Sequence, residues 1–584
     1  MTSNSTINHA LNILLLSGAV MFTGLGAPRL WDRDEPRNAG CARDMWERNE
    51  WIVPTFNGEL RAHKPVLLYW CMMAVYSLGG VNEFTARLPS ALCAMGSALA
   101  TYAIGRRLFN STVGLWSGVI LSTSLMFGVA GRAATPDSLL IFCVTLTMFI
   151  FVLFAFPSKD GSYFPQPRWQ AALLYGAMGL AVLAKGPVGL VLPTAVIGMF
   201  LLIQRLPMSE PSNHRASVLI NMLRPFAPLH FLRTCLAMRP LLAIGMVLLV
   251  AAPWYIAVGV KTDGAFLREF FLTHNLDRAT GSMEGHRGGP WYYPVAMLVG
   301  FFPWSIFAVP LVLEIFYRLR FRDKQSDAYL FVTCWVCVWV GIFSIARTKL
   351  PSYVTPCYPA IALLAGCFVH HLQQQTLHIH RYWLPASYAT LAAVGIGILI
   401  GIPIAAEKFL PGEAWLGLLG IVPLSAGLIA AVSWYWNKTS WPAPLVAAAG
   451  GVVVIGILAV GASRADLQRH DQQMVLALAK TSTTESPLVA YRVLEPSWVY
   501  YSHQTIPELL GLPATAARLL EEHPGATLVT KEQLVPAIRR ELDGEVQVVE
   551  SAPHFLRNEH LVILRRKVPG PSARTASASQ GKNL

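Results

Sequence analysis

The chain has 584 residues, of which 54% are hydrophobic and only 14% are charged, whereas a soluble globular domain carries about 25% charged residues. The excess of apolar residues must face lipid, which excludes an ordinary soluble protein. A net charge of +13 would suggest nucleic-acid binding in a soluble protein. Here the basic residues cluster in short loops between apolar runs, as expected for the cytoplasmic loops of a multi-pass membrane protein, so no nucleic-acid partner is expected.

Apolar runs recur from residue 11 to residue 462 and have about the 20-residue length that crosses a hydrocarbon core. The N-terminal residues lack a basic region and a small-residue cleavage site, so the first run is expected to be a retained span. The sequence predicts apolar helices at 11–28, 65–80, 86–105, 112–131, 138–156, 170–184, 187–204, 240–260, 292–316, 327–346, 352–370, 383–404, 415–436 and 442–462.

The basic loops around Arg106, Arg233 and Arg320 should all be cytoplasmic. If the N-terminus is inside and every apolar run spans, these loops fall on the outer side. If the run 65–80 lies at the outer interface instead, they all move inside and about 13 spans remain. This run is short, ends at two glycines and carries Tyr69, which suits an interface. An ordinary span at 65–80 is the alternative. The predicted fold is an all-α polytopic membrane domain over residues 1–462.

Residues 29–85 form the first outward segment, and its acidic pair, Asp34 and Glu35, follows directly after the first span. Asp137 opens a later helix on the same side. Acidic residues suit a helix N-terminus, and Pro36 suits the first helical position. The acidic residues could therefore serve only to start helices in a solvated loop. A catalytic role is the competing interpretation.

After residue 462 the pattern changes to the apolar runs PLVAYRVL, GATLVTK, EVQVVE and LVILRRK, which alternate with polar, helix-like segments. This pattern predicts a small soluble α/β domain at 463–567. Residues 568–584 are small and polar without a hydrophobic pattern, and we expect a disordered tail.

Several motifs follow one another in order: D-E-P-R, H-K-P-x-L-x-Y-W, R-L-P-S-A-L, R-x-A-T-P-D-S and L-A-K-G-P. Over roughly residues 10 to 370 the chain thereby resembles the aminoarabinose-transferase-like branch of the GT-C glycosyltransferases, which is related to dolichyl-phosphate-mannose protein O-mannosyltransferases. The resemblance implies a polyprenyl-phosphate sugar donor and an inverting transfer on the outer face of the inner membrane. No nucleotide-sugar site is implied.

The resemblance makes Asp34 the main catalytic candidate, together with Glu35 and Asp137. A carboxylate can deprotonate or orient an attacking hydroxyl. A phosphate acceptor needs no such base, and Asp34 would then position the acceptor or stabilise positive charge on the sugar ring. Both roles remain open.

A lipid-phosphate donor requires cations near the membrane surface, because guanidinium and ammonium groups hold phosphate oxygens. Snorkelling at a helix end is the competing explanation for a lysine there, and an interfacial belt is the competing explanation for aromatic residues. The candidates for the donor phosphate are Arg37, Lys64, Arg278 and Lys349, and those for substrate binding are His63, Tyr69, His274, His286 and Tyr292.

Metal binding is disfavoured, because His63, His274 and His286 show no short ligand spacing. No metal ligand is assigned, and a divalent metal stays an option only. Relatives often have an acid where this chain has His63, which puts the identity of the donor sugar in doubt. Glycines at 285, 288 and 289 suit a mobile loop over an active site.

The expected function is transfer of an aminoarabinose-like sugar or a hexose from a polyprenyl phosphate to lipid A, another envelope glycolipid or a protein. The active site and the C-terminal domain are expected on the periplasmic side. One alternative is a protein O-mannosyltransferase-like enzyme. Another is a transporter or flippase of lipid-linked sugars, but no internal repeat is visible. A non-catalytic assembly or sensor protein would not need so many spans.

Overall fold

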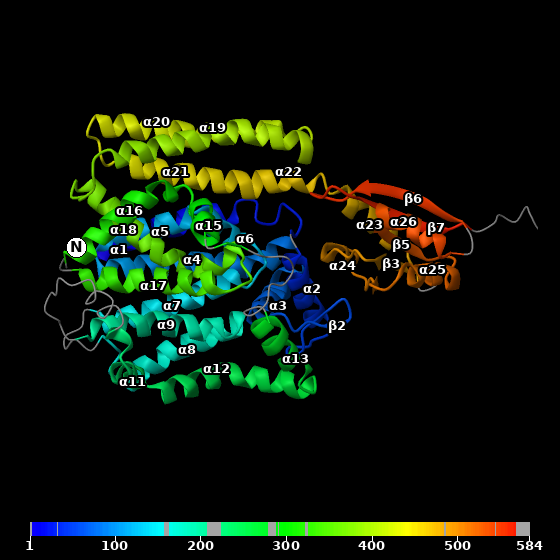
Figure 1. Cartoon of the computed structure of the whole chain (residues 1–584), viewed down its shortest axis with the longest axis horizontal. Helices are drawn as coiled ribbons and strands as arrows, with labels where there is room; N and C mark the ends of the chain where they lie inside the picture. Colours follow the sequence, from blue (N-terminus) through cyan, green and yellow to red (C-terminus); the bar gives the residue numbers. More distant parts are fainter. Residues whose placement is uncertain are drawn as a thin grey trace, which may run out of the picture. The chain divides into compact units, whose positions relative to one another are not determined.

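The computed structural model describes residues 3–31, 33–156, 163–206, 224–277, 288–289, 291–321, 325–483, 486–542 and 545–567. Two compact units make up the chain, and Figure 1 shows the elements of each. The first unit contains Met1–Arg29, Cys41–Pro54 and Leu60–Ser463. The second contains Leu30–Gly40, Thr55–Glu59 and Arg464–Leu584. The expectations for Arg278, His286 and the tail 568–584 lie outside the described residues.

The first unit is a bundle of helices, and each apolar segment expected from the sequence falls on a helix or on consecutive helices. The predicted all-α membrane domain is thereby confirmed. Its main helices are α1 (Ser3–Phe22), α3 (Leu67–Gly79), α4 (Glu83–Leu108), α5 (Ser111–Ser122), α6 (Leu125–Arg132), α7 (Asp137–Ala155), α8 (Arg168–Lys185), α9 (Val188–Gln204), α11 (Pro228–Ala237), α12 (Pro240–Lys261), α13 (Ala265–Arg268), η2 (Glu269–Asp277), α15 (Tyr292–Gly300), η3 (Trp304–Phe307), α16 (Ala308–Arg320), α17 (Ser326–Ile345), η4 (Pro351–Cys357), α18 (Tyr358–Gln373), α19 (Trp383–Phe409), η5 (Ala414–Gly420), α20 (Ile421–Tyr435) and α21 (Pro442–Ile455).

Within the described ranges, nine helices are long and apolar enough to cross a membrane, or up to ten if the pair α5 and α6, bent by 66°, forms one span. The 13 residues of α3 rise about 20 Å, which is less than a hydrocarbon core of about 30 Å. This length agrees with an interfacial position for α3. The total of about 13 spans, which counts shorter and broken helices, stays a prediction.

Two buried arginines hold the end of α1. Arg87 is 4% exposed, and its guanidinium donates to the carbonyl oxygens of Leu25 (2.9 Å), Pro28 (2.8 Å) and Arg29 (3.0 Å). Arg132 is 6% exposed and donates to two carbonyl groups near the end of the same helix. Carbonyl groups at and after a helix end have no partner within the helix. The two arginines supply those partners and fix the point at which the first outward segment begins.

The second unit contains a five-stranded mixed sheet in the order β4-β3-β5-β7-β6. Strand β3 pairs in parallel with β4 and β5, while β7 pairs antiparallel with β5 and β6. Four of these strands coincide with the predicted apolar runs, so the small α/β domain is confirmed. The two-residue β4 was not predicted. The elements are β3 (Leu488–Tyr491), β4 (Glu508–Leu509), β5 (Thr527–Lys531), β6 (Val546–Pro553) and β7 (His560–Arg566), with α23 (His470–Ala479), α24 (Pro496–Ser502), α25 (Pro513–Glu522) and α26 (Val535–Arg540).

Parts of the first outward segment pack within this second unit. The Leu30 amide donates to the Tyr501 hydroxyl at 2.7 Å. The Asn57 side chain donates to the Ile506 carbonyl and accepts from the Ile506 amide, both at 2.9 Å. The side-chain amide of Asn57 thus pairs with the Ile506 backbone as a residue of a neighbouring strand would. The C-terminal domain therefore includes residues from near the N-terminus.

Candidate active site

The acidic pair of the first outward segment begins helix α2 (Asp34–Glu47), and its two members differ in environment. Asp34 is exposed. Glu35 is 5% exposed, and its Oε2 accepts the Trp31 amide at 2.6 Å. That bond fixes the turn that leads into the helix, and both carboxylates favour the helix N-terminus electrostatically. Glu35 thus has a local structural role, and Asp34 is the carboxylate at the surface.

Arg37 lies one turn after Asp34 in the same unit and is half-buried. Its charge acts on Glu508 of β4. Burial raises the pKa of the Glu508 carboxyl above its ordinary value, and the positive charges of Arg37 and Arg33 oppose that rise. Arg37 therefore lies in a region of the second unit that already contains an acidic group.

In the first unit, Asp137 opens α7 and forms an ion pair with Lys185, the last residue of α8. The side chains are 17% and 15% exposed. Helix α8 ends at Gly186, whose φ of +82° is accessible mainly to glycine. The Lys185 Nζ also lies 5.6 Å from the ring centroid of Tyr353 in η4. A charged pair at a break between apolar helices faces protein or water rather than lipid.

Lys349 occupies the turn before η4 and is 5% exposed. Its Nζ donates to the Ser344 carbonyl at 2.7 Å and lies 5.4 Å from the ring centroid of Tyr293. Tyr292 packs edge-on against Tyr293, with ring centroids 5.1 Å apart. A Cβ added to Gly288 would lie 2.7 Å from the Tyr292 ring and 2.9 Å from Lys349 Cδ. A larger residue at this position would therefore force one of these two side chains to shift.

Lys64 precedes α3, whereas Tyr69 lies in its first turn, and the two side chains differ in exposure. Tyr69 is fully buried, and its hydroxyl accepts the Arg61 Nε–H at 3.3 Å. This contact gives Tyr69 a packing role in the first unit. Lys64 is half-buried and follows directly after His63.

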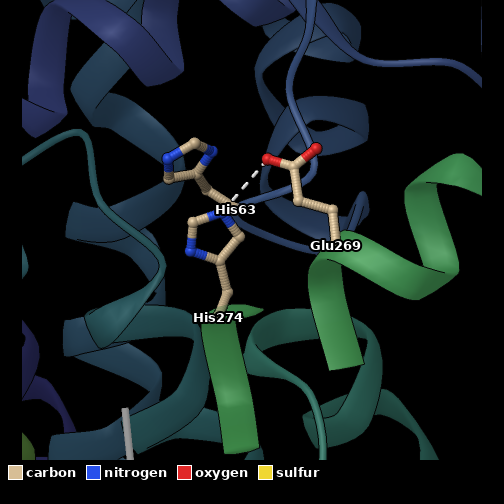
Figure 2. Close-up of side chains that lie close together, drawn as sticks. All are labelled: His63, Glu269 and His274. Atoms are coloured by element: carbon tan, nitrogen blue, oxygen red, sulfur yellow. Dashed lines mark hydrogen bonds and ion pairs between the residues drawn. The ribbon is translucent and has the colours of Figure 1, made fainter. Parts of the chain in front are cut away.

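His63 lies against a turn of η2, as Figure 2 shows. The rings of His63 and His274 are 3.9 Å apart between centroids, and His274 Nε2 lies 3.2 Å from Glu269 Oε1. Each residue offers one ligand atom, and these atoms lie within 4.8 Å of one another. Glu269 and His274 are five residues apart in a π-helix, whose hydrogen bonds join residues i and i+5. This winding brings the two side chains to one side.

Two histidines and one carboxylate form a ligand set that zinc takes in catalytic sites, where a fourth position stays open to water or substrate. The sequence disfavoured a metal because its candidate ligands have no short spacing. The structure instead brings together His63 and His274, more than 200 positions apart, and adds Glu269. No sequence signal marked Glu269, because its role depends on the π-helical turn.

We expect purified protein to contain about one zinc ion per chain, as three ligands at one point imply. Glu269→Gln should lower the zinc content severalfold, and His274→Ala should abolish it. The measurement is metal analysis after dialysis against trace chelator, with Glu407→Gln on α19 as a control that leaves the content unchanged. Equal zinc in all four proteins, or none in the unmodified one, would rule out this site.

Residues 63–230 match the family model of dolichyl-phosphate-mannose-protein mannosyltransferases. The chain is 27% identical to the undecaprenyl phosphate-alpha-4-amino-4-deoxy-L-arabinose arabinosyl transferase of Pectobacterium carotovorum, over 70% of this chain and 68% of that protein. It is 26% identical to the enzyme of that name from Pseudomonas fluorescens, over 92% of each. The matched regions span only 66 to 68% of several curated relatives.

Among solved structures, ArnT from Cupriavidus metallidurans bound to undecaprenyl phosphate is similar, with a TM-score of 0.71 and 19% identity over 96% of this chain and 98% of that one. The chain therefore has the GT-C glycosyltransferase fold and is a multi-pass membrane protein. Within this class, its sequence is similar to those of aminoarabinose transferases. The expected resemblance is confirmed, whereas the roles of the individual site residues stay predictions.

Proposed function

We propose that the protein is an integral membrane glycosyltransferase that moves a sugar from a polyprenyl-phosphate donor to an envelope acceptor. The observation that carries this proposal is the placement of Lys185 and Lys349 beside the tyrosines of η4 and α15. Both lysines are largely removed from solvent. Ionisable groups in the membrane part of a protein are costly and usually serve function.

The reaction that fits these groups is a displacement at the anomeric carbon of the donor sugar. The acceptor oxygen forms a new bond to that carbon while the bond to the lipid phosphate breaks, and the phosphate leaves with the electron pair. Negative charge then grows on the departing phosphate. Preorganised cations at that position lower the barrier more than most other contributions. We assign this role to Lys349 and Lys64, with Arg37 and Arg278 as the further candidates.

Lys185 is held by Asp137, which leaves the pair close to neutral. We propose that Asp137 acts through Lys185, by setting the position of its ammonium group beside Tyr353, rather than by accepting a proton. Asp34 then stays the carboxylate that acts on the acceptor. His63, His274 and Tyr292 are proposed to contact the substrate, or a metal ion in the case of the histidines.

The donor is proposed to be an undecaprenyl-phosphate sugar, because relatives of similar sequence are named for this lipid and a structure of the same fold was solved with undecaprenyl phosphate. The proposed acceptor is lipid A, another envelope glycolipid or a protein. We further propose that the reaction takes place on the periplasmic side of the inner membrane. The arrangement of basic loops supports this orientation.

The test is transfer by purified protein in lipid vesicles that contain a donor extract, with products read by mass spectrometry. The unmodified protein should glycosylate an envelope glycolipid fraction. Lys349→Met should lower the rate by about a hundredfold, because it removes one preorganised cation. Lys408→Met, which changes an exposed lysine at the end of α19, should transfer normally. Absence of any product from the unmodified protein, or full activity of Lys349→Met, would contradict the proposal.

A further inference from the structure

A cavity of about 320 Å³ lies within the second unit. Its size is at the lower end of the range for small-molecule sites, about 300 to 1,000 Å³. The wall combines two residues just before α2 with residues at or near the starts of α23 and α24 and from the turn after β6. It is formed by Trp31, Arg33, Arg469, Asp471, Glu495, Pro496, Ser497, His554, Phe555, Leu556 and Arg557.

Part of the wall is a network that holds its shape. His554 is 3% exposed, with Nε2 3.3 Å from Glu495 Oε1 and Nδ1 2.9 Å from Glu559 Oε1. Burial opposes ionisation of Glu495, yet its bond with His554 and the charge of Arg33 hold the pKa of this carboxyl below its ordinary value. Arg469 donates to the Ser497 hydroxyl at 3.2 Å. These groups are engaged with one another, so the cavity is formed before any ligand arrives.

Other groups in the wall retain capacity for a ligand. Asp471 is 4% exposed; its Oδ2 accepts the Phe555 amide at 3.4 Å, and its Oδ1 has no hydrogen-bond partner among the described residues. The Trp31 Nε1–H likewise has none within the described ranges. A buried polar atom without a partner destabilises the folded state. A ligand that donates to Asp471 and accepts from Trp31 would remove this cost.

A cation and two aromatic rings complete the site. The Arg557 side chain is 39% exposed, and its contacts with Glu495 (3.5 Å) and Glu559 (3.8 Å) are long. A guanidinium has five N–H donors, so it can still bind an anion. The rings of Trp31 and Phe555 lie 6.0 Å apart between centroids. They offer apolar faces next to polar groups.

We propose that this cavity binds an anionic saccharide, the head of the acceptor, with Arg557 on the anionic group, Asp471 on a hydroxyl or amino group and Trp31 against the ring. The inference rests on the proposed transferase function, because the cavity includes Trp31 and Arg33, and Asp34 follows directly in the chain. The site holds and positions the acceptor and takes no part in bond breaking.

The experiment is calorimetric titration of the full-length protein in detergent with glucose 1-phosphate, glucose and inorganic phosphate. The sugar phosphate should bind at least tenfold more tightly than either of the other two. Arg557→Gln should weaken its binding at least tenfold, and the nearly isosteric Asp471→Asn should weaken it severalfold. Arg540→Gln, an exposed arginine of α26, is the control and should bind as the unmodified protein does.

Three results would overturn the inference: no binding of the sugar phosphate, equal binding of inorganic phosphate alone, or unmodified affinity in both variants. Asp34→Asn separates this inference from the proposed function. It should bind the sugar phosphate with unchanged affinity although its transfer is slowed. If the unmodified protein binds the sugar phosphate but transfers no sugar, the saccharide site is supported and the transferase proposal is contradicted. If it transfers sugar but does not bind the sugar phosphate, the transferase proposal is supported and the saccharide site is contradicted.

Discussion

Asp34→Asn is expected to lower the rate of sugar transfer by about 10²- to 10⁴-fold when the acceptor is a hydroxyl, the range that one general base contributes. The change removes a negative charge and keeps the shape of the side chain. Because Asp34 is exposed at the first position of α2, the unfolding temperature of the variant should be only slightly lower than that of the unmodified protein. Initial rates in lipid vesicles, together with thermal unfolding in detergent, measure both effects.

The acceptor decides which role Asp34 plays. A phosphate acceptor needs no base, so the same substitution should then cost less, about tenfold, through lost positioning. The matched control is Glu35→Gln. Its amide oxygen can still accept the Trp31 amide, so transfer should stay within a few fold of normal. Unchanged transfer by Asp34→Asn with both kinds of acceptor would remove Asp34 from the mechanism.

The second large effect concerns the pair of Asp137 and Lys185. Asp137→Asn leaves the Lys185 ammonium partly buried without its counter-charge, and Lys185→Met does the same to the carboxylate. Removing one partner of a buried ion pair costs up to 3–5 kcal/mol, and we expect the lower end, about 3 kcal/mol, because the side chains retain 15% and 17% exposure. Each single variant should therefore unfold at a clearly lower temperature.

The double variant separates stability from activity. Asp137→Asn with Lys185→Met contains no unpaired charge, so much of the lost stability should return, which a double-mutant cycle detects as coupling. Transfer should stay low, because the ammonium group beside Tyr353 is gone. If the double variant regains transfer as well as stability, the pair is purely structural. If the two single effects simply add, the groups do not form the pair.

The fold was largely predictable because membrane helices and short strands leave strong local patterns. Apolar runs located the helices of the first unit, and four apolar runs located β3, β5, β6 and β7. What the pattern could not reveal was tertiary assembly. Nothing local indicates that Leu30 and Asn57 pack with residues near 500, or that α5 and α6 bend by 66° at Thr123 and Ser124.

The candidate site was predictable only where motifs carry residues of distinctive chemistry. The R-x-A-T-P-D-S motif pointed to Asp137, and L-A-K-G-P drew attention to Lys185, but their pairing depends on how α7 and α8 pack. Glu269 was missed because its approach to His274 requires a π-helical turn. The buried setting of Tyr69 was missed because aromatic residues at an interface and in a core look alike in sequence.

The hydrogen bond between the Leu30 amide and the Tyr501 hydroxyl joins residues 471 positions apart. The ribosome therefore completes nearly the whole chain before the segment that leads into Asp34 can reach its final partner. The Asn57 side chain likewise cannot pair with Ile506 until residue 506 has been synthesised. A chain cut short by an early stop codon would insert its helices but leave this segment unanchored. Timing during biosynthesis thus couples the acidic residue at the start of the protein to the integrity of its end.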